Sequence, residues 1–249
     1  MFVDLRIDSS AADRVQAAAM PKELLNAPRT IWDFLQAPKL RCLAILGYPG
    51  SGKTMLLKHI SVTLLQRHPI RGFRGVLPIF IPLRSLHGRL LQQPNITLTD
   101  LIVQTMTGEG LRPPPQWFER RLQRGRCLVM FDGPDEVGTI EERLLLIEWF
   151  NRTVALPAYA KNRFIITSRP LGYRDNPSNQ INVTLKVQPF NPDQQGQFID
   201  RWFLADEIKR EGGKSAAYVR EEAKRWATSL LNEIRQSEAF SDLAQNPLL

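Results

Sequence analysis

The sequence predicts an α/β protein with a doubly wound, mostly parallel sheet that is flanked by helices and followed by a small helical subdomain. Three observations support this fold class. Short apolar runs without polar alternation recur along most of the chain, as expected for strands buried on both faces of a sheet. Helical patterns separate these runs, which favours right-handed crossovers between parallel strands. After about residue 190 the strand signals stop and only helical patterns remain.

Six apolar runs of four to eight residues are the predicted strands, and most are rich in Val, Ile, Leu or Phe. They cover residues 3–7, 42–46, 76–83, 127–131, 164–167 and 181–187. Ligands of such a sheet bind at the carboxyl ends of its strands. Residues 28–189 are therefore the predicted α/β core, and residues 1–27 are a preceding strand and linker region.

Residues that cap helices mark where several predicted helices begin. Thr97, with Asp100 three residues later, opens one helix, and Asn191 followed by Pro192 opens another. A further long helix covers about residues 215–235. Residues 190–249 form the predicted helical subdomain. Its predicted buried faces are Phe198, Ile199, Trp202 and Phe203 on the first helix, and Tyr218, Ala223, Trp226, Leu230 and Ile234 on the second.

Composition limits the class of protein. Apolar residues make up 43% and charged residues 23%, as in folded globular proteins. No uncharged apolar run reaches about 18 residues, and charged residues interrupt the first twenty positions, so neither a membrane span nor a signal peptide is predicted. Cys42 and Cys127 lie inside apolar runs, which favours buried free thiols and a cytoplasmic protein.

The formal charge of +8 makes a nucleic-acid partner possible. Such a partner is not favoured, because Arg and Lys are spread along the chain rather than gathered in one block. Several arginines surround one predicted helix, and either a solvated face or an intersubunit or partner surface would explain them. These are Arg112, Arg120, Arg121, Arg124 and Arg126.

A glycine-rich segment between a predicted strand and a predicted helix matches the phosphate-binding pattern G-x-x-x-x-G-K-[ST] in full. Its glycines permit backbone angles that point successive amide groups at a phosphate, and the helix N-terminus adds partial positive charge. Lys53 is expected to reach the β- and γ-phosphates, and the Thr54 hydroxyl to ligate Mg²⁺. The predicted nucleotide-binding residues of this P-loop are Gly47, Tyr48, Pro49, Gly50, Ser51, Gly52, Lys53, Thr54 and Met55.

A metal-positioning acid is expected at the end of a neighbouring strand, where Asp132 follows the run at 127–131. Asp132 is thus the second predicted Mg²⁺ ligand, acting through water. Glu136 is the first choice to polarise the water that attacks the γ-phosphate, Asp135 is the second, and a solvated acidic turn is the alternative. Arg169, after the next strand, is predicted to place a permanent cation near the γ-phosphate and so to distinguish ATP from ADP.

Together these segments resemble the NACHT family of STAND-class signalling ATPases, which is related to AAA+ proteins. The resemblance covers about residues 28–249 and rests on GYPGSGKT, FDGPDE, TSRP and LAQNPLL. It implies that Arg169 senses the γ-phosphate, that Pro247 packs against adenine, and that Thr30 and Ile31 flank the base. Pro134 departs from the family pattern, in which this position is usually aliphatic or aromatic, and it stiffens the loop that carries the two later acids.

The resemblance implies a molecular switch that binds ATP or ADP with Mg²⁺, hydrolyses ATP slowly and oligomerises in the ATP state. Innate immune or antiviral signalling is the expected setting. Family members continue into winged-helix and sensor regions, and many begin with an effector domain, so we expect a fragment of a larger protein or a minimal member. An AAA+-type motor or nucleic-acid-remodelling ATPase is the alternative, which the charge of +8 would suit.

Overall fold

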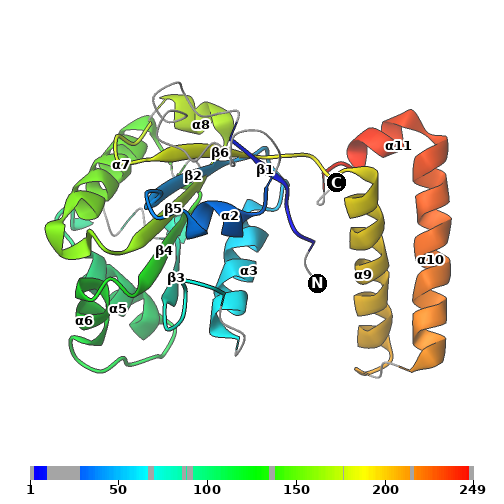
Figure 1. Ribbon diagram of the computed structural model, residues 1–249, viewed down its shortest axis with the longest axis horizontal. Helices are drawn as coiled ribbons and strands as arrows, with labels where there is room; N and C mark the ends of the chain where they lie inside the picture. The colour runs from blue at the N-terminus through cyan, green and yellow to red at the C-terminus, as the bar shows by residue number, and fades with distance from the viewer. Residues whose placement is uncertain are drawn as a thin grey trace.

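A mostly parallel sheet organises the protein, as the sequence predicts. The computed structural model describes residues 3–9, 29–66, 70–85, 88, 92–134, 138–175, 177–213 and 216–246. These residues form a six-stranded sheet with the order β1-β6-β2-β5-β4-β3, in which only the β1–β6 pair is antiparallel (Figure 1). The strands are β1 (Ile7–Asp8), β2 (Cys42–Leu46), β3 (Leu77–Pro82), β4 (Cys127–Asp132), β5 (Arg163–Ser168) and β6 (Val183–Val187).

Burial explains why five of the six strand predictions hold. Every residue of β2 is buried, and β4 is buried except at its last residue, because helices cover both faces of the central strands. β3 contains Pro78 and Pro82, which cannot donate ladder hydrogen bonds, and it accordingly lies at the edge of the sheet. The prediction of a strand at residues 3–7 is wrong in extent, since pairing to β6 begins only at Ile7.

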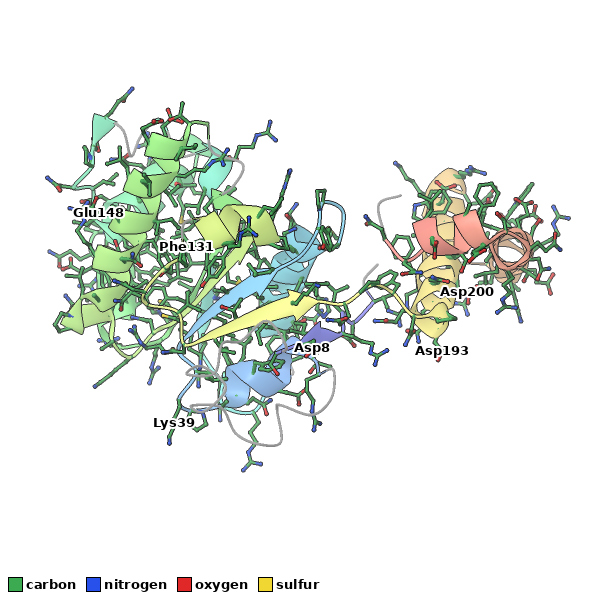
Figure 2. The ribbon with its side chains drawn as sticks, turned by 90° about the horizontal axis from the view of Figure 1, so that it is seen from above. Asp8, Lys39, Phe131, Glu148, Asp193 and Asp200 are labelled. Carbon is green, nitrogen blue, oxygen red and sulfur yellow. The ribbon has the colours of Figure 1, made fainter. Side chains whose placement is uncertain are left out.

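Helices cover the two faces of the sheet and divide its apolar side chains into two clusters. The helices of this part are α2 (Ile31–Gln36), α3 (Lys53–Leu65), α5 (Leu98–Gly108), α6 (Trp117–Gln123), α7 (Ile140–Ala155) and α8 (Pro170–Asp175). One cluster joins the sheet to α5, α6 and α7, and the other joins it to α2 and α3. In Figure 2, Phe131 lies inside the first cluster, where its ring meets Trp149 and Phe150 edge-on, while Glu148 lies on the outer face of α7.

Two predicted helix caps are present. The Thr97 hydroxyl accepts a hydrogen bond from the Asp100 backbone N–H at 3.1 Å, at the start of α5. Asn191 caps the next long helix through Gln194, whose backbone N–H donates to the Asn191 side chain at 2.9 Å. Each cap satisfies a backbone donor that the first turn leaves without an intrahelical partner.

A helical hairpin follows β6 and stands beside the α/β core, as Figure 1 shows. It consists of α9 (Pro192–Arg210) and α10 (Ala217–Gln236), and the short α11 (Glu238–Leu243) leads back toward the core. Ile199, Ala227 and Ile234 form its small buried centre. The backbone N–H of Phe190 donates to the Gln245 carbonyl at 2.9 Å, which ties the end of the hairpin to the segment that leaves β6.

The predicted buried face of α10 is partly wrong. Tyr218 is 56% exposed and Trp226 is 47% exposed, and Trp202 on α9 is also largely exposed. Ala223 and Ile234 are buried as predicted, but Val219 and Ala227 take the places expected for Tyr218 and Trp226, so the face that meets α9 is rotated by about one residue at these positions. Small alanine side chains allow the two helices to approach closely, and this geometry leaves the aromatic rings outside. None of the described helices is long and apolar enough to span a membrane.

Candidate nucleotide-binding site

The glycine-rich loop connects β2 to α3, where the sequence places it. Gly50 has φ +82° and Gly52 has φ +85°, both in the left-handed region that favours glycine. A side chain on Gly47 would collide with the Ser51 hydroxyl. The Gly47 N–H donates to the Ser168 carbonyl at 3.1 Å, which fixes the start of the loop against the end of β5. The loop geometry therefore depends on glycine at the two positions that the motif specifies, 47 and 52, and also at Gly50, which the motif leaves open.

Lys53 folds back over the loop that precedes it. Its ammonium group donates to the carbonyl oxygens of Gly47 at 2.7 Å and of Tyr48 at 3.0 Å. These bonds hold a positive charge beside the backbone amides of the loop, at the N-terminus of α3. The arrangement concentrates positive potential where a phosphate group would bind.

Ser51 supplies a test of whether this loop fits a phosphate. Its hydroxyl is buried and is one of two buried side-chain oxygens without a hydrogen-bond partner among the described residues. A buried hydroxyl without a partner costs free energy, so a bound group that supplies a partner would be favoured there. The Ser51 hydroxyl can donate to a phosphate oxygen, and the loop therefore fits the group that its sequence predicts.

Asp132 at the end of β4 meets the first helical residues of α3. The Thr54 hydroxyl donates to one Asp132 carboxylate oxygen at 2.7 Å. The Thr167 hydroxyl, on β5, donates to the other carboxylate oxygen at 2.6 Å and accepts from the Gly133 N–H at 3.2 Å. The two predicted Mg²⁺ ligands are thus brought into contact, and a third residue holds the carboxylate in place.

The strand order corrects one expectation about this cluster. β2 and β4 are not neighbours, because β5 lies between them and pairs with both. The Asp132 side chain still reaches Thr54, and Thr167 on β5 lies between β2 and β4. Sequence reasoning missed Thr167, although it ends the apolar run at 164–167. A polar residue at the carboxyl end of a buried parallel strand is the signal that would have found it.

The oxygen ligands of this cluster suit magnesium. Mg²⁺ is usually bound by one or two protein oxygens, several waters and the phosphates of a nucleotide, rather than by a protein cage. Within the described part of the chain, no group of three His, Cys, Asp or Glu side chains is arranged to hold a metal ion. Thr54 and Asp132 are therefore the residues that would hold Mg²⁺, together with phosphate oxygens.

Arg169 lies at the same edge of the sheet as the P-loop. It directly follows Ser168, whose carbonyl accepts from Gly47, and it is exposed. Its own carbonyl accepts from the Tyr173 N–H at 3.0 Å, at the start of α8. Asp135 and Glu136 lie outside the described residues, so their predicted roles at the γ-phosphate stay predictions.

The segment that follows α11 contacts the P-loop through Asn246. The Asn246 side-chain amide donates to the Pro49 carbonyl at 3.0 Å. A side chain on Gly50 would collide with Asn246, so glycine is needed there for packing as well as for its backbone angle. Asn246 belongs to the quoted LAQNPLL segment, yet sequence reasoning singled out only the residue after it. Pro247, the predicted adenine contact, lies outside the described residues.

The remaining predicted nucleotide contacts occupy different surroundings. Thr30 is the N-cap of α2, and its backbone N–H and hydroxyl both donate to Asp33 at 2.9 Å. The Ile31 side chain is buried in the cluster beneath α2. Tyr48 is 64% exposed with Lys186 over its ring, and Met55 is 48% exposed. Tyr48 and Met55 are therefore accessible to a ligand, whereas the Ile31 side chain faces the core.

Comparison with known proteins agrees with this geometry. The model of the NACHT domain family matches residues 41–206. An uncharacterized WD repeat-containing protein from Nostoc sp. is 30% identical over 142 residues, which are 55% of this chain and 9% of that protein's length.

Two solved structures also match at low identity. PCH-2 from C. elegans has a TM-score of 0.42 at 16% identity, with 80% of this chain and 45% of that chain covered. Cdc6p from Pyrobaculum aerophilum has a TM-score of 0.38 at 14% identity, with 63% and 41% covered.

Proposed function

Because the chain belongs to the NACHT family of P-loop NTPases, we propose that it is a nucleotide-dependent switch of a signalling protein. In this proposal it binds ATP or ADP with Mg²⁺, hydrolyses ATP slowly and self-associates in the ATP state. Innate immune or antiviral signalling is the proposed setting. The contact of Thr54 with Asp132 beneath the P-loop is the observation that carries the nucleotide-binding part.

The residues of the site divide the work of holding a triphosphate. Lys53 exchanges its bonds to Gly47 and Tyr48 for bonds to phosphate oxygens, and Ser51 gains a partner for its buried hydroxyl. Thr54 and Asp132 hold Mg²⁺, with Thr167 orienting the carboxylate. When bound, Mg²⁺ neutralises negative charge on the phosphate oxygens and so favours transfer of the γ-phosphoryl group to water.

Other residues are proposed to read the γ-phosphate and the base. Arg169 starts one residue after the carbonyl that anchors the P-loop, so its side chain is proposed to distinguish ATP from ADP. Glu136, or Asp135 in its place, is proposed to polarise the attacking water. Pro247, Thr30 and the backbone of Ile31 are proposed to contact the adenine, since the Ile31 side chain faces the core.

A switch requires that its conformation depend on the bound nucleotide. The bond from Asn246 to Pro49 supports this part of the proposal, because it makes the segment that follows the hairpin and α11 depend directly on the shape of the P-loop. Rearrangement of the loop around a γ-phosphate changes the carbonyl that Asn246 contacts. The hairpin is therefore proposed to be the element that moves.

Replacement of Lys53 by Ala tests the central claim. Loss of its charge-assisted bonds to phosphate is expected to weaken Mg·ADP and Mg·ATP binding about 10- to 100-fold. Isothermal titration measures the affinity. Lys58→Ala is the matched control, since Lys58 is exposed on the same helix, α3, and its replacement is expected to leave binding unchanged. Unweakened binding in Lys53→Ala would overturn the proposed site.

Slow hydrolysis and self-association are tested on the unaltered protein. A switch is expected to purify with bound ADP, to turn over slowly, and to gain mass in light scattering only with a non-hydrolysable ATP analogue. Continuous turnover without retained nucleotide would instead support a motor. If the mass of the protein did not change when the ATP analogue was added, self-association would be excluded.

A further inference from the structure

A group of exposed basic residues lies where β3, β4 and β5 begin, at the amino ends of the strands and opposite the P-loop. We call it the basic edge and define it as Arg71, Arg74, Arg124, Arg126 and Lys161. Arg71 and Arg74 precede β3, Arg126 precedes β4, and Lys161 precedes β5. Because these three strands are parallel, the segments that enter them meet at one edge, and the P-loop leaves β2 at the other.

Hydrogen bonds and one close approach hold the three segments of the basic edge together. The Arg126 carbonyl accepts from the Leu77 N–H at 2.8 Å, and the Arg121 guanidinium donates to the Gly75 carbonyl at 3.4 Å. Gly125 has φ +65° and lies so close to Lys161 that a side chain there would collide with it. The segments that carry the five cations are thus neighbours across β5, β4 and β3, strands that lie about 4.8 Å apart.

The charge of these segments is unbalanced. Residues 70–76, 121–126 and 161–163 contain no Asp or Glu, and their basic residues are Arg71, Arg74, Arg121, Arg124, Arg126, Lys161 and Arg163. Mutual repulsion of like charges destabilises a fold unless a partner neutralises them. No acidic residue within these three segments balances their positive charge, and an anionic partner would do so.

Arg121 and Arg163, the two of these seven basic residues that lie outside the basic edge, have evident structural roles. Arg121 also stacks 5.1 Å from the Trp117 ring, and Arg163 lies 5.0 Å from the Phe73 ring. Both are half-buried. By contrast, the side chains of the basic edge are exposed and form no hydrogen bond or ion pair with other described residues.

By position in the chain, stabilisation of a helix end accounts for one member of the basic edge, Arg124. The helices α3 and α5 end near the strand entries, and a cation in the last turn would favourably meet the negative end of the helix dipole. Neither helix has a basic residue in its last turn. Only Arg124 sits at a helix end, as the C-cap of α6.

The chemistry of the basic edge favours a phosphodiester backbone as the partner. Four of its five members are arginines, whose planar guanidinium binds phosphate oxygens in pairs. A duplex presents a dense row of phosphates with a charge about every 1.7 Å along its axis. The three segments expose no large apolar side chain that could insert into a lipid surface, since Phe73 and Leu122 are buried. We propose that the basic edge binds the backbone of a nucleic acid without sequence preference.

Neutralisation of the basic edge tests this proposal in the full chain. The variant carries Arg74→Gln, Arg124→Gln and Arg126→Gln. The matched control carries Lys209→Gln, Lys224→Gln and Arg235→Gln, three exposed cations of the hairpin, so both proteins lose the same charge. Fluorescence anisotropy measures binding to labelled 30-base-pair DNA and RNA duplexes from 50 to 200 mM KCl, with saturating Mg·ADP to occupy the P-loop.

The unaltered protein and the control are expected to bind both duplexes with a dissociation constant of about 1 to 100 μM. The basic-edge variant is expected to bind at least about 10-fold more weakly, and its salt slope is expected to fall by about 2 to 3, since each lost phosphate contact removes about 0.9. In a second variant, Arg71→Gln with Lys161→Gln, the salt slope is expected to fall by about 2. Its use guards against a folding defect, as does equal Mg·ADP affinity in all the proteins.

Three results would overturn the proposal. Equal duplex binding by the basic-edge variant and its control would show that total charge alone attracts the duplex. If Lys53→Ala lost duplex binding while the basic-edge variant kept it, the P-loop and not the basic edge would bind the phosphates of the duplex. Binding to phosphatidylcholine vesicles with 30% phosphatidylserine but not to either duplex would make the edge a membrane-surface site instead. The outcome is independent of whether the chain acts as a switch.

Discussion

At the scale of single residues, Thr167 shows how the site depends on a group that does not itself reach a phosphate. Asp132 needs a fixed orientation to hold a cation, and its two carboxylate oxygens receive hydrogen bonds from residues on different elements, Thr54 on α3 and Thr167 on β5. Thr167 is fully buried and also accepts from the Gly133 N–H. It is therefore a positioning residue for the metal site.

Thr167→Val removes this support while nearly keeping the side-chain shape. We expect the Mg²⁺ concentration needed for half-maximal nucleotide binding to rise about 10-fold, since loss of a partner of a metal-binding group typically weakens metal affinity by 10- to 100-fold. Titration of Mg²⁺ against a fluorescent ADP analogue measures it. Thr184→Val, in buried β6, is the control and should leave the Mg²⁺ dependence unchanged. If both variants need the same Mg²⁺ concentration, Thr167 has no positioning role.

At the scale of elements, the segment after α11 links the hairpin to the nucleotide site, because the Asn246 side chain donates to the Pro49 carbonyl. The small centre of the hairpin, with Ala227 between Ile199 and Ile234, gives α9 and α10 their own packing. The hairpin can therefore keep its internal structure when its contact with the P-loop changes. This combination suits an element that moves as a unit.

Asn246→Ala is expected to loosen the hairpin from the P-loop. Loss of one hydrogen bond of about 1 kcal/mol corresponds to an increase of about fivefold in the ADP dissociation rate. Stopped-flow displacement measures that rate, and hydrogen exchange should become faster in α11 and in residues 47–52. Asn232→Ala, on the exposed surface of α10, is the control. Unchanged dissociation and exchange in Asn246→Ala would show that the contact couples nothing.

The elements that could be predicted are those whose structure is determined by the local sequence. The central strands were predictable because burial on both faces leaves continuous apolar runs, as in β2 and β4. The face of α10 was not, since Ala223 and Ala227 are buried only because α9 approaches them. The position of Thr167 depends on strand order, which arises from contacts between distant segments. The P-loop was predictable because its backbone geometry requires specific residue types at fixed spacing.

At the scale of the whole molecule, the parallel sheet separates two charged regions. Its carboxyl ends carry the P-loop, Asp132 and Arg169, whereas its amino ends carry the basic edge. The buried strands between them pack with the flanking helices in two apolar clusters that form the body of the core. Cys42 in β2 and Cys127 in β4 both lie within this body, in the cluster beneath α5, α6 and α7. Their thiols therefore report on the integrity of the whole core.

Burial raises the pKa of the Cys42 thiol to about 11 and that of Cys127 to about 12, against an ordinary value of 9.0. Nearby Arg41 and Arg121 oppose this rise only partly. The folded state thus favours the protonated thiols. Their stabilising contribution is complete below pH 9.0 and is lost as the pH rises through 11 to 12, because the unfolded chain releases these protons first.

At pH 10 the unfolding free energy is expected to be lower than at pH 7 by about 1.4 kcal/mol for each thiol. Other groups also titrate in this range, so the comparison is made with Cys42→Ala and Cys127→Ala together, which removes only the two thiols. Urea unfolding at pH 7, 8, 9 and 10 should show a smaller decline in the double variant than in the unaltered protein. Parallel declines would mean that the two thiols are not held protonated by the core. A smaller decline would show that the packing of β2 and β4, the strands that join the two charged regions, keeps both thiols protonated in the folded state.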